Sequence, residues 1–158
     1  MSVIEDRIRE LGYEVPSVAA PVAAYVPAAR NGIYVHTSGQ LPFVDGALPA
    51  TGKVGIGEGL VSPEQAEELA RLCALNGLAA ARGVLGSLDK ITQVVKVTAF
   101  VASDPSFTGQ PAVANGASVF LGQAFGDLGI HVRPAVGVAV LPPDAPVEIE
   151  FTFEAAGE

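Results

Sequence analysis

The chain has 158 residues and a single cysteine, so its length suits one domain with one sizeable core and excludes an internal disulfide framework. Seventeen acidic residues against nine basic ones give a net charge of −8 with no cluster of Lys and Arg, which argues against a nucleic-acid partner. Hydrophobic residues make up 49% and charged residues only 16%, so we expect apolar surface to be buried between copies in a homo-oligomer.

Residues 1–20 are expected to form an N-terminal extension of a single domain that spans residues 1–158. Val3, Ile4, Ile8 and Leu11 recur at helical spacing, which predicts a short helix that ends near Gly12. Charged residues fill the positions where a signal peptide needs apolar ones, so a cytoplasmic location is expected. Because no apolar stretch reaches about 18 residues, no membrane-spanning helix is predicted.

Two short apolar runs, residues 22–29 and 32–37, follow the turn residues Pro16 and Pro21. Asn31-Gly32 lies between the runs, and this dipeptide is typical of a tight β-hairpin. Residues 38–42 then interrupt the second strand, and the glycine-rich residues 45–59 are expected to form a loop.

Ser62-Pro63-Glu64-Gln65 predicts the start of a long helix, with serine as the N-cap and proline in the first turn. The helix has a face of small and apolar residues, which favours close packing on a sheet: Ala66, Leu69, Ala70, Cys73, Gly77, Ala80, Ala81 and Val84. Residues 91–102 alternate as a strand does, and a second helix is predicted over residues 113–125, before Gly126.

Two last apolar runs, residues 132–141 and 146–153, flank Pro142-Pro143-Asp144 and predict a pair of strands. Beyond the N-terminal helix, the order of elements is therefore two strands, a helix, a strand, a helix and two strands. This order favours an α+β fold whose sheet is covered by helices on one face.

Arg133 is the only Lys or Arg after Lys96, and it lies inside the apolar run of residues 130–141. Burial of an unpaired guanidinium costs several kcal/mol, so an anion is expected opposite it. The anion is either a carboxylate of the chain, with Glu148 and Glu150 as the candidates, or an anionic ligand held through two parallel hydrogen bonds.

Other kinds of site have little support. The glycines of residues 46–59 match neither a phosphate-binding nor a dinucleotide-binding loop, so no cofactor is predicted. His36 and His131 lack neighbours at metal-ligand spacing, and no metal site is predicted. Cys73 lies on the apolar face of its helix, where a free cysteine acts as a small hydrophobe.

Taken together, the chain resembles the RidA (YjgF) family from about Pro21 onward. The resemblance is carried by Ala24-Tyr25-Val26, by Ile33-Tyr34-Val35-His36-Thr37-Ser38-Gly39-Gln40-Leu41-Pro42, by Val132-Arg133-Pro134-Ala135-Val136-Gly137-Val138-Ala139-Val140-Leu141-Pro142 and by Val147-Glu148-Ile149-Glu150. It implies a chorismate-mutase-like α+β fold, a mixed sheet with two main helices on one face, that assembles as a homotrimer with ligand clefts between subunits.

The resemblance also implies a reaction, the hydrolysis of reactive enamines and imines such as 2-aminoacrylate to 2-keto acids and ammonia, without a cofactor. Arg133 would grip the substrate carboxylate, and Glu148 would hold or activate the attacking water. Tyr25, Ser38, Gly39, Asn115 and Ala135 would line the cleft.

Several of these residues have an alternative structural interpretation. Ser38 suits a strand-end hydroxyl that bonds the backbone, Tyr25 an interface aromatic and Asn115-Gly116 a local kink. Archetypal deaminases have Arg-Ser-Cys where this chain has Arg133-Pro134-Ala135, which removes a backbone donor and a thiol from the cleft. A binding module for small carboxylates is therefore the rival function, and a ribonuclease is disfavoured by charge.

Overall fold

The computed structural model describes residues 2–18 and 24–157. The helices and strands follow the predicted order: α1 (Val3–Glu10), β1 (Ala28–Asn31), β2 (Tyr34–Thr37), α2 (Pro63–Leu85), β3 (Ile91–Ala102), α3 (Gln110–Phe125), β4 (Ala135–Val138) and β5 (Val147–Ala155). Three short 3-10 helices lie between them: η1 (Leu88–Lys90), η2 (Gly126–Gly129) and η3 (Pro142–Asp144).

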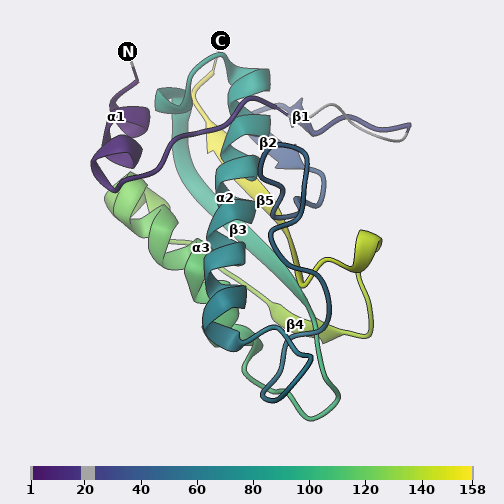
Figure 1. Ribbon diagram of the computed structural model, residues 1–158. Coiled ribbons are helices and arrows are strands. Elements are labelled where there is room, and N and C mark those ends of the chain that lie inside the picture. Colours follow the sequence, from purple (N-terminus) through teal and green to yellow (C-terminus); the bar gives the residue numbers. More distant parts are fainter. Residues whose placement is uncertain (1, 19–23, 158) are drawn as a thin grey trace.

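The five strands form one mixed sheet in the order β1-β2-β5-β3-β4. All neighbours are antiparallel except β3 and β4, which run parallel. The helices α2 and α3 lie side by side across one face of this sheet, and α1 packs beside α3 (Figure 1). The α+β architecture with helices on one face is thus confirmed.

The predicted hairpin of β1 and β2 forms, with Gly32 and Ile33 as its two turn residues and Asn31 as the last residue of β1. Asn31 pairs with Tyr34, and Gly32 adopts a φ of 62° in the left-handed region that glycine tolerates. Regular pairing begins only at Ala28, so the first strand is shorter than the apolar run of residues 22–29. The start of that run, at residues 22 and 23, and the turn expected at Pro21 lie outside the described residues.

The long helix α2 begins as the sequence predicts. The Ser62 hydroxyl oxygen accepts a hydrogen bond from the Gln65 N–H at 3.1 Å, and Gly86 ends the helix in the left-handed conformation. Its small residues allow close packing: a Cβ added at Gly77 would lie 2.5 Å from the ring of Phe151 on β5. Val84, predicted on the buried face, is 38% exposed instead.

The second long helix, α3, begins at Gln110, three residues before the predicted start, because Pro111 occupies its first turn. Gly116 is the point of closest approach to α2, since a Cβ there would lie 1.8 Å from the backbone oxygen of Glu67. The sequence Asn115-Gly116 is therefore part of a continuous helix, and the glycine serves helix packing.

Each of the last two apolar runs contains a strand, as predicted, but the two strands do not pair with each other. β4 covers only Ala135–Val138 and pairs with β3, whereas β5 pairs with β3 on its opposite edge. The run is also far from buried in a single chain, because Val132, Val136 and Val140 are 65%, 44% and 68% exposed. The apolar pattern thus marks a surface strand segment at the edge of the sheet.

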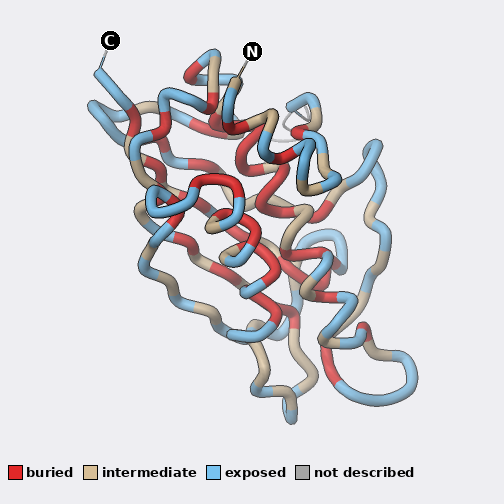
Figure 2. Tube along the Cα trace, turned by 90° about the vertical axis from the view of Figure 1, so that its left-hand side faces the viewer, coloured by how far each residue is buried: buried red, intermediate tan, exposed pale blue. Residues whose placement is uncertain are grey.

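Buried residues concentrate between the helices and the sheet, while the outer segments are largely exposed (Figure 2). Strand β5 lies at the centre of this core, with alternate side chains fully or almost fully buried: Val147, Ile149, Phe151 and Phe153. Across residues 2–18 and 24–157, no helix has the length and apolar character needed to cross a membrane.

Because α2 and α3 approach closely at Gly116, we predict that the effect of a glycine-to-alanine substitution on stability differs strongly between positions of α3. Gly116→Ala should lower the free energy of unfolding by about 2–3 kcal/mol, because a methyl group there collides with backbone. Gly122→Ala on the same helix meets nothing within 4 Å and should be stabilising by up to about 1 kcal/mol. Urea denaturation of both variants checks this, and equal stabilities would contradict the close approach.

Candidate functional site

A cavity of about 540 Å³ opens where the chain leaves β2, between α2 and η3. Its walls combine apolar side chains with five residues that carry a polar side-chain group, one of them the aromatic Tyr25. The lining residues are Ser17, Val18, Tyr25, Pro27, Gly39, Gln40, Leu41, Phe43, Asn76, Ala79, Pro142, Pro143 and Glu148. Among the residues predicted for the site, Tyr25, Gly39 and Glu148 are brought together here.

A β-bulge at the end of β2 shapes the floor of the cavity. His36 pairs with Thr152, but Gln40 pairs with Ile149, so the β2 side contains one residue more than the β5 side. Within the bulge, the Ser38 hydroxyl donates to the carbonyl oxygen of Val26 at 2.6 Å, the backbone role that its strand-end position favours.

Gly39, the other residue of the bulge, allows the chain to pass directly over Glu148. A Cβ at position 39 would lie 1.9 Å from Oε1 of Glu148, so any side chain would displace the carboxyl group. The reason for glycine here is this close approach, because Gly39 does not have the positive φ that would require it.

Glu148 itself is half-buried, and no donor in the described part of the chain forms a hydrogen bond with its carboxyl group. Burial raises its pKa above the ordinary glutamate value, and the negative charge of Glu150 raises it further. A carboxyl group with a raised pKa that borders a cavity can accept a proton from a bound molecule or water and return it.

Arg133 lies elsewhere, packed against α3. Its Nη1 donates to Oδ1 of Asn115 at 2.9 Å and to Oγ of Ser118 at 3.1 Å, and its Nη2 donates to the carbonyl oxygen of Pro111 at 3.2 Å. Two of the five guanidinium N–H groups, on Nε and Nη2, have no partner among the described residues. These two N–H groups can donate to a carboxylate.

A second tier of hydrogen bonds supports the arginine. Oγ of Ser118 lies 2.8 Å from Nε2 of His131, and Nδ1 of that histidine lies 2.6 Å from the carbonyl oxygen of Gly129. Because a carbonyl oxygen only accepts, Nδ1 carries a proton, and Ser118 can donate to Nε2 of a neutral ring while it accepts from Arg133. The chain from His131 through Ser118 therefore orients the guanidinium.

The ion pair of Arg133 with Glu148 or Glu150 that the sequence allowed does not form within the chain. In the parallel register of this segment with β3, Arg133 lies opposite the buried Val97. Its side chain is therefore on the face of the sheet that carries the helices. Glu148 alternates with buried neighbours on β5 and therefore points to the opposite face. The two predicted catalytic residues are thus separated in one chain.

Ala135, the last predicted cleft residue, is the first residue of β4 and is half-buried beside the core, outside the cavity. Sequence reasoning missed several residues of the two clusters: Leu41, Phe43, Asn76, Pro142, Pro143, Ser118 and His131. Leu41 follows directly on the Ser38-Gly39-Gln40 segment, and this adjacency is a signal that could have pointed to the cavity wall.

Cysteine and metal chemistry find no support in the described residues. They contain no cluster of three or more His, Cys, Asp or Glu side chains able to hold a metal ion. Cys73 is fully buried, and burial, with the charge of Glu148 as a lesser cause, raises the pKa of its thiol well above the usual value. The thiol therefore stays protonated and acts as core packing.

The buried position of Glu148 predicts a pH-dependent gain of stability when its charge is removed. Because folding raises the pKa of Glu148, the protonated carboxyl group stabilises the folded state relative to the unfolded one. This contribution to the free energy of unfolding is complete below the ordinary pKa of about 4.3 and is lost as the pH rises through the pKa of the folded state. Glu148→Gln mimics the protonated form, so it should raise Tm by about 1–3 °C at about pH 7.5 and leave it unchanged near pH 4.

Differential scanning calorimetry at the two pH values measures this effect, with Glu58→Gln on an exposed loop as the control that should show neither change. A lower Tm of Glu148→Gln at the higher pH would contradict the prediction, since it would mean that the ionised carboxylate has a favourable partner.

Comparison with known proteins places these features in a family. Residues 5–152 match the family described as "YjgF/chorismate_mutase-like, putative endoribonuclease". The protein TCP17 of Trypanosoma cruzi is 41% identical over 148 residues, which cover 93% of this chain and 91% of that protein.

Solved structures agree with this match. The crystal structure of Atu1372 from Agrobacterium tumefaciens, a protein of unknown function, is 42% identical with a TM-score of 0.89 and covers 98% of this chain and 93% of that one. The E. coli protein TdcF, solved with bound serine, is 25% identical with a TM-score of 0.62 and covers 89% and 94% of the two chains. The resemblance seen in the sequence and the chorismate-mutase-like fold are confirmed, and the chain belongs to the YjgF (RidA) family.

Proposed function

We propose that the protein hydrolyses reactive 2-imino acids and their enamine tautomers to 2-keto acids and ammonia. The observation that carries this proposal is the half-buried carboxyl group of Glu148, which borders a cavity, lacks a hydrogen-bond donor from the chain and has a raised pKa. Such a group is suited to general acid–base catalysis on a water molecule.

The second element of the site is Arg133 of a neighbouring copy. One chain holds Glu148 and Arg133 on opposite faces of the sheet, so a complete site needs two chains. Strand β4 offers a surface for this assembly, because its outer edge is unpaired in the chain and Val132, Val136 and Val140 are exposed around it. A closed homotrimer with three equivalent clefts satisfies this requirement.

The carboxylate of the substrate binds the free Nε–H and Nη2–H of Arg133, and this contact sets the distance of the imine carbon from Glu148. Glu148 accepts a proton from water as the water oxygen bonds to the imine carbon, and it returns this proton to the nitrogen to give a carbinolamine. The hydroxyl proton of the carbinolamine then moves through Glu148 to the amino group, the C–N bond breaks, and ammonia leaves as the carbonyl forms. Each turnover consumes one water and requires no cofactor.

A related protein supports the choice of a carboxylate ligand. TdcF was crystallised with serine, a small amino acid that carries a carboxylate. The rival function is a trimeric module that binds such a carboxylate without turnover. It is favoured by Pro134 and Ala135 next to the arginine, where archetypal family members have residues that can donate a hydrogen bond or supply a thiol.

The family description also includes an endoribonuclease. The net charge of −8 and the scattered basic residues provide no phosphate-binding surface of the kind that RNA requires. RNA cleavage is therefore not part of the proposed function.

Complementation between two inactive variants tests both the reaction and the shared site. Arg133→Ala and Glu148→Gln should each lose turnover of freshly generated 2-imino acids, measured as ammonia and keto-acid release above the uncatalysed rate. Co-expressed in equal amounts, the two variants should recover about one quarter of the wild-type rate, because each mixed trimer regains one intact cleft.

Zero recovery in purified mixed trimers would contradict a site shared between chains. Binding of pyruvate without turnover of any imine by the wild-type protein would overturn the deaminase and support the binding module. Circular dichroism and native mass spectrometry of each variant exclude loss of folding or assembly as the cause of inactivity.

The contact between Ser118 and Arg133 predicts a second, milder effect. Ser118→Ala should raise KM about 3- to 10-fold with little change in kcat, because the loss of one charge-assisted hydrogen bond loosens the guanidinium that binds the substrate. Ser118→Thr retains the hydroxyl group and should restore most of the affinity. An unchanged KM in Ser118→Ala would show that the network does not position Arg133.

A further inference from the structure

The cavity beside Glu148 is much larger than a small imine needs. Its volume of about 540 Å³ equals that of about 18 water molecules at ~30 Å³ each. A three-carbon imino acid has six non-hydrogen atoms and would leave most of this space as water against apolar walls. The size falls instead in the range of roughly 300–1,000 Å³ that is typical of pockets for larger organic ligands.

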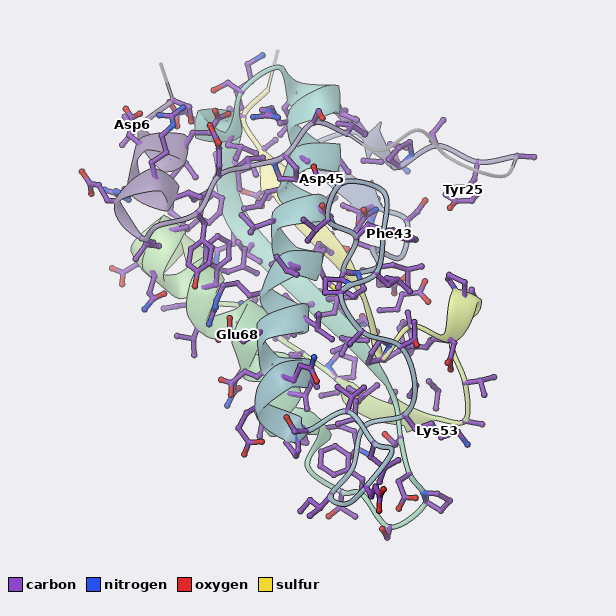
Figure 3. The ribbon with its side chains drawn as sticks, in the orientation of Figure 1. Asp6, Tyr25, Phe43, Asp45, Lys53 and Glu68 are labelled. Atoms are coloured by element: carbon purple, nitrogen blue, oxygen red, sulfur yellow. The ribbon has the colours of Figure 1, made fainter. Side chains whose placement is uncertain are left out.

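Apolar and aromatic residues make up most of the cavity walls. Leu41 and Phe43 belong to the segment after β2, and Pro142 and Pro143 form the lip at η3. Tyr25 adds a second aromatic ring from the extended segment before β1. Figure 3 shows Tyr25 and Phe43 on the same side of α2, contributed by these two separate segments.

The two side-chain amide nitrogens in the walls already donate to the backbone. The Asn76 side-chain nitrogen donates to the carbonyl oxygens of Leu41 and Phe43 at 2.9 and 3.1 Å, and Gln40 donates to the carbonyl oxygen of Ser38 at 3.0 Å. The Glu148 carboxyl group is the charged acceptor of the lining, and no Lys or Arg lines the cavity among the described residues. A ligand would therefore place an N–H group at Glu148 and an apolar group in the rest of the space.

We infer that the preferred substrate is a 2-imino acid with a bulky apolar side chain, aromatic or branched, which fills the cavity of Leu41, Phe43 and Pro143. The inference rests on the proposed function and deepens it. The imine nitrogen faces Glu148, the carboxylate reaches Arg133 of the neighbouring copy, and the side chain extends toward the walls. Burial of a phenyl or isobutyl group there supplies binding energy that a methyl group cannot supply.

A comparison of imines of different size tests this preference on the intact protein. An amino-acid oxidase generates the imines of alanine, leucine and phenylalanine in place, and keto-acid release above the uncatalysed rate is measured for each. We expect kcat/KM for the phenylalanine-derived and leucine-derived imines to exceed that for the alanine-derived imine at least about 10-fold.

A variant links any preference to the cavity. Phe43→Ala should lower the ratio of the phenylalanine-derived to the alanine-derived rate about 5- to 10-fold, because it removes apolar wall. Val44→Ala changes the adjacent exposed residue, which does not line the cavity, and should leave the ratio unchanged. Inhibition by phenylpyruvate and pyruvate gives a second reading of the same preference, with phenylpyruvate expected to bind more tightly.

The outcomes separate the two proposals. Turnover of the alanine-derived imine alone, or equal rates for all three, would overturn the inference about size and leave the deaminase intact. No turnover of any imine would overturn the deaminase itself. A preference for bulky imines that survives Phe43→Ala would place their side chains outside this cavity and overturn the inference.

Discussion

The alternation of side chains along β5 is the constraint on which both the core and the site depend. Val147, Ile149 and Phe151 are buried beneath the helices, and Gly77 lets α2 approach until it contacts the ring of Phe151. A strand whose inward residues are held in this way has no freedom of register, because a shift by one residue would expose the whole apolar set. The outward position of Glu148 is thus set by the packing of its neighbours.

The same constraint explains why the carboxyl group is both costly and useful. Glu148 is held under the bulge at Gly39, where the backbone excludes part of its solvent and no donor replaces it. The fold therefore tolerates a charge that would be more stable in water, and the result is a raised pKa. A perturbed pKa of this kind, gained at some cost in stability, is common at functional sites.

Local signals in the sequence were enough to predict the helices and strands. They could not predict the contacts between residues that lie far apart in the chain. The cap at Ser62, the turn at Gly32 and the alternation of residues 91–102 each depend on near neighbours, and each element was predicted correctly. The partners of Arg133 could not be predicted, because Asn115 and Ser118 approach it only when α3 crosses the sheet. The exposure of the apolar run around β4 could not be predicted either, because composition does not show whether a run is buried within a chain or between chains.

The separation of Arg133 and Glu148 within one chain is itself informative about the site. Each is held firmly by its own surroundings, the arginine by α3 and the glutamate by β5, yet the two lie on opposite faces of one sheet. If the proposed function holds, these two half-sites within a chain, together with an unpaired apolar edge strand, would make assembly a condition of activity. Chemistry at such a site would switch on only where two copies meet, so dissociated chains would be inert even though each is fully folded.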